Sequence, residues 1–154
     1  MLPTASNASR IAVFAVVAIG IARILQAERH CLRTLALHGA AMHQAWLSEI
    51  AENEKLRAVW APPGDKLTSD AYSMLVHCNR QVSLLSAKFR AGLLDRRTLR
   101  VQARWLMERE IGRTYWHEFG PFRTQEAKDR VDRTFNRIFD DEYMAVSNSD
   151  TVTL

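Results

Sequence analysis

The side chains that could bind a metal are histidines and cysteines, and their spacing in this sequence does not match a metal site. Ligand pairs on a helix lie three or four residues apart, with a second pair to complete the site. His38 and His43 are five residues apart, roughly 140° around a helix. His77 and Cys78 are adjacent and point apart, and Trp116-His117-Glu118 lacks the second histidine of His-Glu-x-x-His. We therefore predict no metal-ligating residue.

Residues for covalent catalysis or phosphate binding form no motif either. There is no Gly-x-Ser-x-Gly turn, and neither cysteine has a base close to it in the sequence. The six glycines are scattered, and none belongs to a Gly-x-x-x-x-Gly-Lys phosphate loop. We predict no catalytic residue, no cofactor-binding residue and no cofactor. One enzyme hypothesis stays open, a site assembled from sequence-distant residues such as His77, His117 and Glu118.

Two charged clusters have simpler explanations than ligand binding. The carboxylates of Asp140-Asp141-Glu142 fan over about 200° of a helix, so they cannot converge on one cation, and we predict a solvated face. The best nucleic-acid candidate is the group Arg96, Arg97, Arg100 and Arg104. However, residues 95–154 carry eleven basic and eleven acidic side chains, and no helix-turn-helix pattern surrounds the arginines. We therefore do not expect nucleic acid as a partner.

Apolar side chains recur at helical spacing, which predicts an all-α fold. Segment 69–92 has the clearest pattern, with inward positions Ala71, Leu75, Cys78, Val82, Leu85 and Phe89. Ser69 or Asp70 should cap this helix and Gly92 should end it. Asp95 should open a second helix to Ile111 that forms an antiparallel hairpin with the first.

The remaining elements follow from the same spacing and from breakers. The second helix should turn inward Leu94, Val101 and Trp105, with Leu99 and Leu106 beside them. Gly112 and Gly120-Pro121 should interrupt the chain around a short helix, 113–119. Thr124 should cap a last helix to about Ala145, with inward positions Ala127, Val131, Phe135 and Ile138. The predicted core anchors are Trp46, Trp60, Trp105 and Trp116.

The most distinctive stretch is Ile11 to Ala22, IAVFAVVAIGIA, twelve residues without a charge in a chain that is 25% charged. As a helix it measures roughly 18 Å, and roughly 22 Å if it extends to Leu25, against a bilayer core of ~30 Å. We predict a membrane anchor in contact with lipid. Two alternatives stay open: a core helix of a soluble protein, and a signal peptide cleaved after Ala22.

Basic residues border this apolar run on both sides: Arg10 precedes it, and Arg23, Arg29 and Arg33 follow it. Their long side chains can reach lipid headgroups. The net charge of +4 lies entirely in residues 1–94, beside the run, which suits anionic lipid. More arginines follow the run than precede it, so we predict a single-pass protein of the cell membrane with the bulk of the chain in the cytoplasm. The two cysteines are expected to be buried and give no disulfide framework, which agrees with a reducing compartment.

The predicted organisation has four parts. Residues 1–9 are a polar leader, 10–33 the membrane anchor and basic juxtamembrane segment, 34–146 a helical domain, and 147–154 a disordered tail. The anchor helix can continue through Gly39 because apolar residues keep helical spacing as far as Ile50. A short helix, Asn53 to Trp60, and the loop 61–65 should follow. The predicted fold is therefore all-α, a long N-terminal membrane helix continuing into a small antiparallel helical bundle.

Several short patterns occur in a fixed order along the chain: Leu56 to Trp60, the helix Tyr72 to Phe89 with Asn79, Gly92-Leu93-Leu94, Gly112-Arg113-Thr114-Tyr115-Trp116, and Phe139-Asp140-Asp141-Glu142-Tyr143. Over about Arg10 to Tyr143, the chain resembles a group of uncharacterised actinobacterial proteins catalogued as a domain of unknown function. The resemblance implies a membrane-spanning helix followed by an all-helical domain. It implies no activity, cofactor or catalytic residue.

These features predict a membrane-tethered helical interaction or scaffold module. Its expected partners are membrane lipid, through Ile11 to Ala22 and the flanking arginines, and another protein or a second copy of the chain. The enzyme hypothesis and a soluble helical protein with the apolar run as a core helix remain the alternatives.

Overall fold

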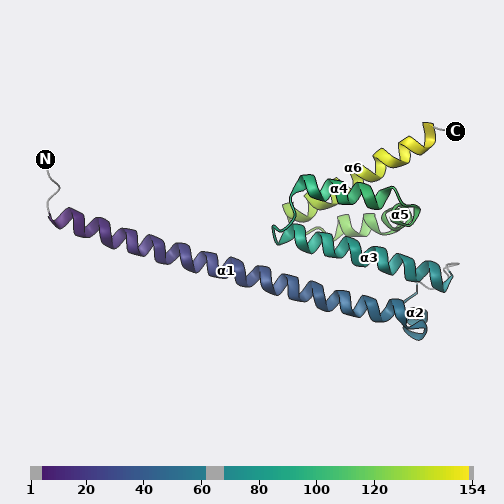
Figure 1. Ribbon diagram of the computed structural model, residues 1–154, viewed down its shortest axis with the longest axis horizontal. Coiled ribbons are helices and arrows are strands. Elements are labelled where there is room, and N and C mark those ends of the chain that lie inside the picture. Colours follow the sequence, from purple (N-terminus) through teal and green to yellow (C-terminus); the bar gives the residue numbers. More distant parts are fainter. Residues whose placement is uncertain (1–4, 62–67, 153–154) are drawn as a thin grey trace. The chain divides into compact units, whose positions relative to one another are not determined.

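The computed structural model describes residues 5–61 and 68–152, with side chains described for 11–61 and 68–148. These ranges contain no strand and the helices α1 (Ala5–Glu52), α2 (Glu54–Trp60), α3 (Ser69–Arg90), α4 (Arg96–Met107), α5 (Glu110–Gln125) and α6 (Arg130–Val152) (Figure 1). The all-α prediction is confirmed over these residues. The predicted loop 61–65 lies, apart from Ala61, outside them.

The first helix, α1, is unbroken over 48 residues and passes through Gly39. It begins at Ala5, inside the predicted polar leader, because the small residues there are compatible with a helix. The chain divides into two compact units, Met1–Ala36 and Leu37–Leu154, and the boundary falls inside α1. Among the described residues, α1 is the one helix long and apolar enough to cross a membrane, and none of its most apolar stretch is buried.

Capping side chains fix the starts of α2 and α3. Asn53 caps α2 by accepting two backbone N–H bonds from the first turn, so the predicted short helix is confirmed. Thr68 caps α3, with Oγ1 3.2 Å from the backbone nitrogen of Ala71. The prediction that Ser69 or Asp70 caps this helix is therefore wrong by one residue, since both lie in its first turn.

Gly92 ends α3, as predicted. Its φ of 72° is a left-handed conformation that glycine adopts without strain. The N–H of Gly92 donates to the carbonyl of Phe89, and that of Leu93 to Lys88, the two bonds of a Schellman motif. Asp95 then caps α4 by accepting a backbone bond of 2.7 Å, also as predicted. These ends were predictable because each depends on one residue and its close neighbours.

The fifth helix, α5, differs most from the prediction. It runs without a break through Gly112, Gly120 and Pro121, which were expected to interrupt it. Gly112 lies where α5 meets α4: a Cβ there would be 2.1 Å from the carbonyl oxygen of Leu106. Glycine is thus required for a close approach and not for a turn. Pro121 removes one N–H donor from a turn whose side chains are largely exposed, and the helix tolerates the loss.

This longer helix shifts its neighbours. Because α5 begins at Glu110, α4 ends at Met107 and not at the predicted Ile111. Thr124 belongs to α5, where its Oγ1 donates to the carbonyl of Gly120 at 3.1 Å, so it does not cap the last helix.

The cap of α6 is Asp129, whose Oδ1 accepts backbone N–H bonds from Val131 and Asp132 at 2.8 and 3.1 Å. The helix continues to Val152, past the predicted end at Ala145. It therefore occupies residues 147–152 of the predicted disordered tail, a stretch without the glycine or proline that would stop it.

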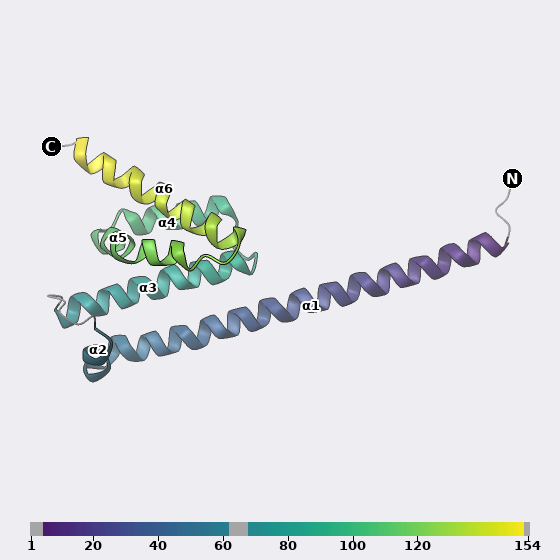
Figure 2. The same cartoon turned by 180° about the vertical axis from the view of Figure 1, so that it is seen from behind.

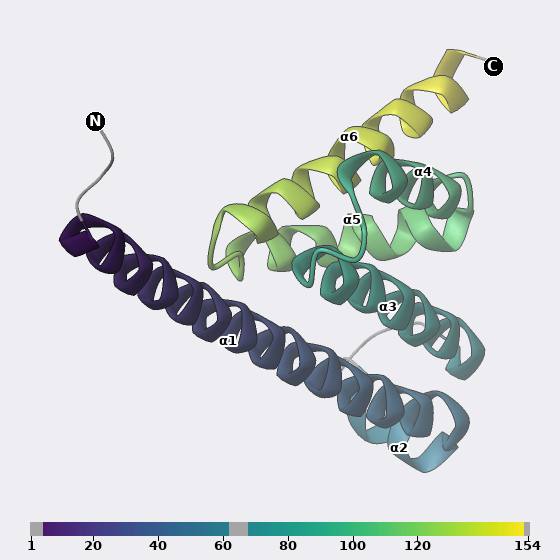
Figure 3. The ribbon, with the colours of Figure 1, turned by 60° about the vertical axis from the view of Figure 1, so that its left-hand side comes forward.

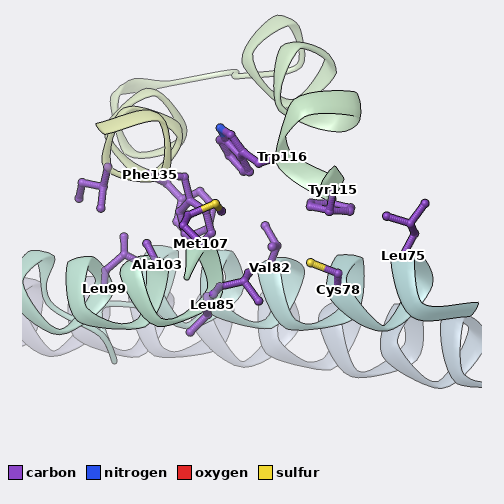
Figure 4. Packing of buried hydrophobic residues seen from close by; sticks show 13 residues of the cluster. Leu75, Cys78, Val82, Leu85, Leu99, Ala103, Met107, Tyr115, Trp116 and Phe135 are labelled. Carbon is purple, nitrogen blue, oxygen red and sulfur yellow. The ribbon is translucent and has the colours of Figure 1, made fainter. Parts of the chain in front are cut away.

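Helices α3 to α6 reverse direction one after another and surround one core (Figures 1 and 2). The last helix, α6, packs across the others and contacts α3, α4 and α5. On α3 the predicted positions Leu75, Cys78, Val82 and Leu85 are buried. Figure 4 shows this row beneath Tyr115 and Trp116 of α5 and Phe135 of α6. The other members of the cluster are Leu99, Ala103, Leu106, Met107, Ile138 and Phe139.

The predicted inward positions of the second hairpin helix are only partly correct: Leu99 and Leu106 are buried and Leu94 is half-buried against the core, but Val101 and Trp105 are exposed. Leu99, Ala103 and Met107 are fully buried, whereas Val101 is 61% and Trp105 48% exposed. Ala103 has a small side chain that permits close packing of α4, which a pattern search for large apolar residues misses. On α6, Phe135 and Ile138 are buried as predicted, while the predicted Val131 is 38% exposed and Ala127 precedes the helix.

The tryptophan prediction is correct for Trp116 and wrong for the other three. Trp116 is 2% exposed, but Trp46, Trp60 and Trp105 are exposed by 41 to 53%. The guanidinium carbon of Arg109 lies 3.4 Å from the centroid of the Trp105 ring, so a cation covers this ring where packing does not. Trp46 and Trp60 lie elsewhere, at the mouth of a cleft.

A second, smaller cluster holds the end of α1 and α2 against α3. Its buried members are Leu47, Ile50 and Ala51 of α1 and Val76 of α3, with Leu56 and Tyr72 partly buried. Gln44 Nε2 donates to the carbonyl of Arg80 at 2.6 Å, which adds a polar tie between α1 and α3. Figure 3 shows α2 folded back at the C-terminal end of α1. This arrangement places aromatic side chains from three helices around one hollow.

Candidate functional site

The residues of the enzyme hypothesis do not meet. His77 is exposed on α3 with Nδ1 3.4 Å from Arg80 Nη1, and His117 is exposed on α5 with Nδ1 3.4 Å from the hydroxyl of Tyr143. Glu118 is also exposed. Over the described part of the chain, no three histidine, cysteine or acidic side chains are grouped to hold a metal ion.

The cysteines likewise form no reactive pair. Cys31 is exposed, which corrects the expectation that it is buried, while Cys78 is buried as expected. Burial raises the pKa of the Cys78 thiol to about 12, and the positive charge of Arg123 opposes this only partly. The thiol is therefore protonated at neutral pH and is not a nucleophile.

The acidic cluster on α6 was predicted as a solvated face, which is correct for the exposed Asp140 and Asp141 and wrong for the buried Glu142. Asp140 Oδ1 accepts the indole N–H of Trp116 at 2.7 Å, and Asp141 and Glu142 both accept from Arg100 of α4. Glu142 is only 5% exposed. The three carboxylates serve separate structural contacts, as their fanned spacing requires. The pairing also neutralises Arg100, one of the arginines of the nucleic-acid candidate.

One hollow of the second unit is an apolar cleft with a cavity volume of about 260 Å³. It lies between the end of α1, α2, α3 and α5. Its lining residues are Trp46, Leu47, Ile50, Trp60, Tyr72, Leu75, Val76, Asn79, Tyr115 and Phe119. Hollows that are largely apolar with a few polar groups are the usual form of small-ligand sites.

Two tryptophans form the mouth of this cleft. The rings of Trp46 and Trp60 are 5.3 Å apart at 83°, an edge-to-face pair. Tyr72 donates its hydroxyl proton to the carbonyl of Trp60 at 2.9 Å, which ties α2 to α3. Both tryptophans remain about half exposed, so their apolar faces are available to a ligand.

At its other end the cleft meets a polar network that joins α3 to α5. Asn79 Oδ1 accepts from the hydroxyl of Tyr115 and from Arg123 Nη2, both at 2.8 Å, and from Ser83 Oγ at 3.3 Å. Arg123 also donates from Nε to Tyr115 and from Nη2 to Ser83, each at 2.9 Å. Burial raises the pKa of Tyr115, with Arg123 opposing the shift, so this phenol stays neutral. Every acceptor around the guanidinium is therefore uncharged.

A second hollow of about 340 Å³ adjoins this network. It shares Asn79, Tyr115 and Phe119 with the apolar cleft, and it is also lined by Arg123 and by the exposed Glu126. The two hollows together are apolar at the tryptophan end and carry a cation at the other. This arrangement can bind an apolar group and an anion.

The sequence carried a signal for this site. Tyr115, Phe119 and Arg123 follow at intervals of four and therefore share one face of α5. Because Gly120-Pro121 is typical of a helix end, the sequence pattern divides this row in two and separates Arg123 from Tyr115 and Phe119.

A family model described as a family of unknown function (DUF6082) matches residues 4–153, nearly the whole chain. The chain belongs to this family. The expectation that the chain falls in a family without a known function is thus confirmed. Neither the curated proteins nor the solved structures include a match to this chain. Function must therefore be argued from the geometry of this DUF6082 member itself.

Proposed function

We propose that the protein is a single-pass membrane protein in which α1 tethers a helical binding module, residues 37–152, at the cytoplasmic face of the cell membrane. The observation that carries this proposal is the unburied apolar surface of residues 11–25. Phe14, Val16 and Ile24 are each about 70% exposed, and their neighbours are similar. Burial of one such side chain stabilises by roughly 1.5 to 3 kcal/mol, and a bilayer provides that burial.

The length of the apolar run is compatible with a tether if the membrane adapts. The run measures roughly 22 Å to Leu25, short of the ~30 Å hydrocarbon core. Arg23 can extend its side chain to the headgroups, and local thinning of the bilayer costs only fractions of a kcal/mol per Å. The arginine excess after the run favours a cytoplasmic module.

The binding role is supported by the cleft. It combines exposed aromatic rings with a half-buried arginine. A partner protein, a second copy or a lipid-derived ligand are the classes that such a surface serves.

Cys31 provides a direct test, because it is exposed and lies nine residues after Ala22, while Cys78 is buried. We expect the full chain to stay in membranes after an alkaline carbonate wash. A membrane-impermeant maleimide should modify Cys31 in inverted vesicles but not in right-side-out vesicles. Cys31→Ser should abolish this labelling in both.

Three results would overturn the proposal. Release of the chain from membranes by carbonate would refute the proposal that α1 is a tether. Labelling only in right-side-out vesicles would reverse the orientation. An intact mass that lacks residues 1–22 would identify the apolar run as a cleaved signal peptide.

A further inference from the structure

We propose that the cleft binds a fatty-acid-type carboxylate, with its apolar chain between Trp46, Trp60 and Phe119 and its carboxylate on Arg123. The inference rests on the proposed role of residues 37–152 as a binding module, and it does not depend on the membrane tether.

The first argument is the incomplete environment of Arg123. Its Nε and Nη2 donate to Tyr115, Asn79 and Ser83, but Nη1 has no hydrogen-bond partner among the described residues. No aspartate or glutamate among those residues forms an ion pair with it. The charge is only half exposed, so solvent replaces a counterion poorly. A carboxylate at Nη1 would supply both the missing acceptor and the missing charge.

The second argument is that Arg123 is held in place. Three neutral acceptors from two helices fix the plane of its guanidinium, and Nη1 remains accessible, since no buried side-chain nitrogen of the described residues lacks a partner. Holding a guanidinium in place before the ligand arrives lowers the entropy lost on binding. Arg90 and Arg100, in contrast, each have two carboxylate partners.

The third argument is that the hollow around this cation adjoins the apolar cleft. The two hollows share Asn79, Tyr115 and Phe119, so a ligand held at Arg123 can reach the tryptophans. The connection runs past two aromatic rings whose centroids are 5.2 Å apart, Tyr115 and Phe119. A flexible alkyl chain can follow such a path more readily than a rigid ring system. The volumes, about 260 and 340 Å³, suit a chain of medium length.

Glu126 provides an internal check on the sign of the charge. It is exposed and lines the same hollow as Arg123, without an ion pair to it. Its negative charge opposes an anionic ligand and favours a cationic one. Neutralising Glu126 should therefore strengthen the binding of a carboxylate and weaken that of an amine.

The test uses the full chain in phosphatidylcholine nanodiscs and a decanoic acid that carries a diazirine near its chain end. After illumination, mass spectrometry maps the labelled peptides. We expect labelling of peptides that contain Trp46, Trp60 or Phe119. Unlabelled decanoate should compete at least about tenfold better than decanol or decylammonium, which have the same chain without the negative charge.

Variants test whether the carboxylate of the ligand binds Arg123. Arg123→Gln should lower labelling of the cleft peptides about tenfold, and Glu126→Gln should raise it. Arg97→Gln, which removes an exposed arginine from α4, should leave it unchanged. Circular dichroism melts of each variant in the same nanodiscs show whether the fold is kept. If Arg123→Gln alters the melt, Glu126→Gln and the decylammonium competition carry the test.

Several outcomes would overturn the inference. One is equal competition by decanoate and decanol, and another is unchanged labelling in Arg123→Gln. A third is competition by 2-naphthoate that exceeds that of decanoate, which would mean an aromatic acid site. Labelling confined to residues 11–33 would support the tether and refute the cleft. Cleft labelling of a chain that carbonate releases would support the cleft and refute the tether.

Discussion

Arg100 on α4 donates from Nη1 to Oε1 of Glu142 on α6 at 2.8 Å, although the glutamate side chain is 6% exposed and the arginine side chain 51%. A buried carboxylate without a cation is costly. The packing of α4 on α6 therefore depends on Arg100, although solvent also reaches this side chain. Asp141 accepts from the same guanidinium at 3.1 Å. The pair therefore stabilises the α4–α6 contact, the main contact of α4.

This arrangement predicts strong coupling between the two residues. Arg100→Met should destabilise the fold by about 1 to 3 kcal/mol because Glu142 is left unpaired. Glu142→Gln in that background should recover part of the loss, since an amide is cheaper to bury. Denaturant melts of the full chain in mild detergent measure the free energy of unfolding of the wild type and of these variants. Arg104→Met breaks the exposed 3.5 Å pair with Glu108 and serves as control, with a cost of at most about 0.5 kcal/mol. Equal losses for Arg100→Met and Arg104→Met would contradict the assignment.

Two glycines should respond oppositely to alanine. Gly112→Ala should destabilise by about 1 to 3 kcal/mol, because its Cβ would meet the Leu106 carbonyl at 2.1 Å. Gly39→Ala should stabilise α1 by up to about 1 kcal/mol, because nothing lies within 4 Å of a Cβ there. Thermal melts followed by circular dichroism compare the two. A stabilising Gly112→Ala would show that α4 and α5 do not approach each other this closely.

The ion pair at the start of α6 predicts a pH dependence. The hydrogen bond from Arg90, followed by backbone N–H bonds, lowers the pKa of Asp129 below its ordinary 3.8. A carboxyl with a lower pKa in the folded state stabilises fully above pH 3.8, and this contribution disappears as the pH falls through the folded-state pKa. Asp129→Asn keeps a good helix cap and removes the charge. The difference in melting temperature between wild type and variant should therefore narrow from pH 7 to about pH 2.5. A difference in melting temperature that does not change with pH would mean that the charge of Asp129 adds nothing to the stability of the fold.

The fold was predictable where one residue and its helix decide the outcome. The buried row of α3 follows from a clear period, and Gly92 and Asp95 end and begin helices through bonds to their own neighbours. Contacts between helices override such local rules. Gly112 looks like a breaker, yet it is required by the carbonyl of Leu106, which no sequence pattern indicates.

The candidate site was much less predictable. Trp46 and Trp60 are apolar at helical spacing, and only the way α2 folds back determines that they line a mouth and not a core. Arg123 is one arginine among many in the sequence. It stands out because the three side chains that accept its hydrogen bonds are neutral, and two of them, Asn79 and Ser83, lie about forty positions away in the sequence.

The two cysteines should differ sharply in reactivity. Because burial raises the pKa of Cys78 to about 12, only about one thiol in ten thousand is ionised at pH 8. Iodoacetamide should modify the exposed Cys31 in the native chain and reach Cys78 only after denaturation. Peptide mass mapping after timed labelling distinguishes the two cysteines. In Cys31→Ser, only the slow modification of Cys78 remains to be measured. Comparable native rates would mean that the core around Cys78 opens readily.

The last prediction concerns the tether and uses matched charges. Val17→Arg places a cation at the centre of the apolar run, which should cost about 2.5 to 3.5 kcal/mol of insertion free energy. A run this short has little hydrophobicity in reserve, so the variant should move from the membrane to the soluble fraction. The helical content of residues 37–152 should persist, because their core lies outside the run.

Val59→Arg is the control, since Val59 is 73% exposed on α2 and lies outside the proposed span. It should remain in the membrane fraction like the wild type. If the run instead packed in a soluble protein, Val17→Arg would bury an unpaired charge and abolish the cooperative melt. Wild-type chain that is soluble without detergent, together with loss of that melt in Val17→Arg, would therefore refute the tether.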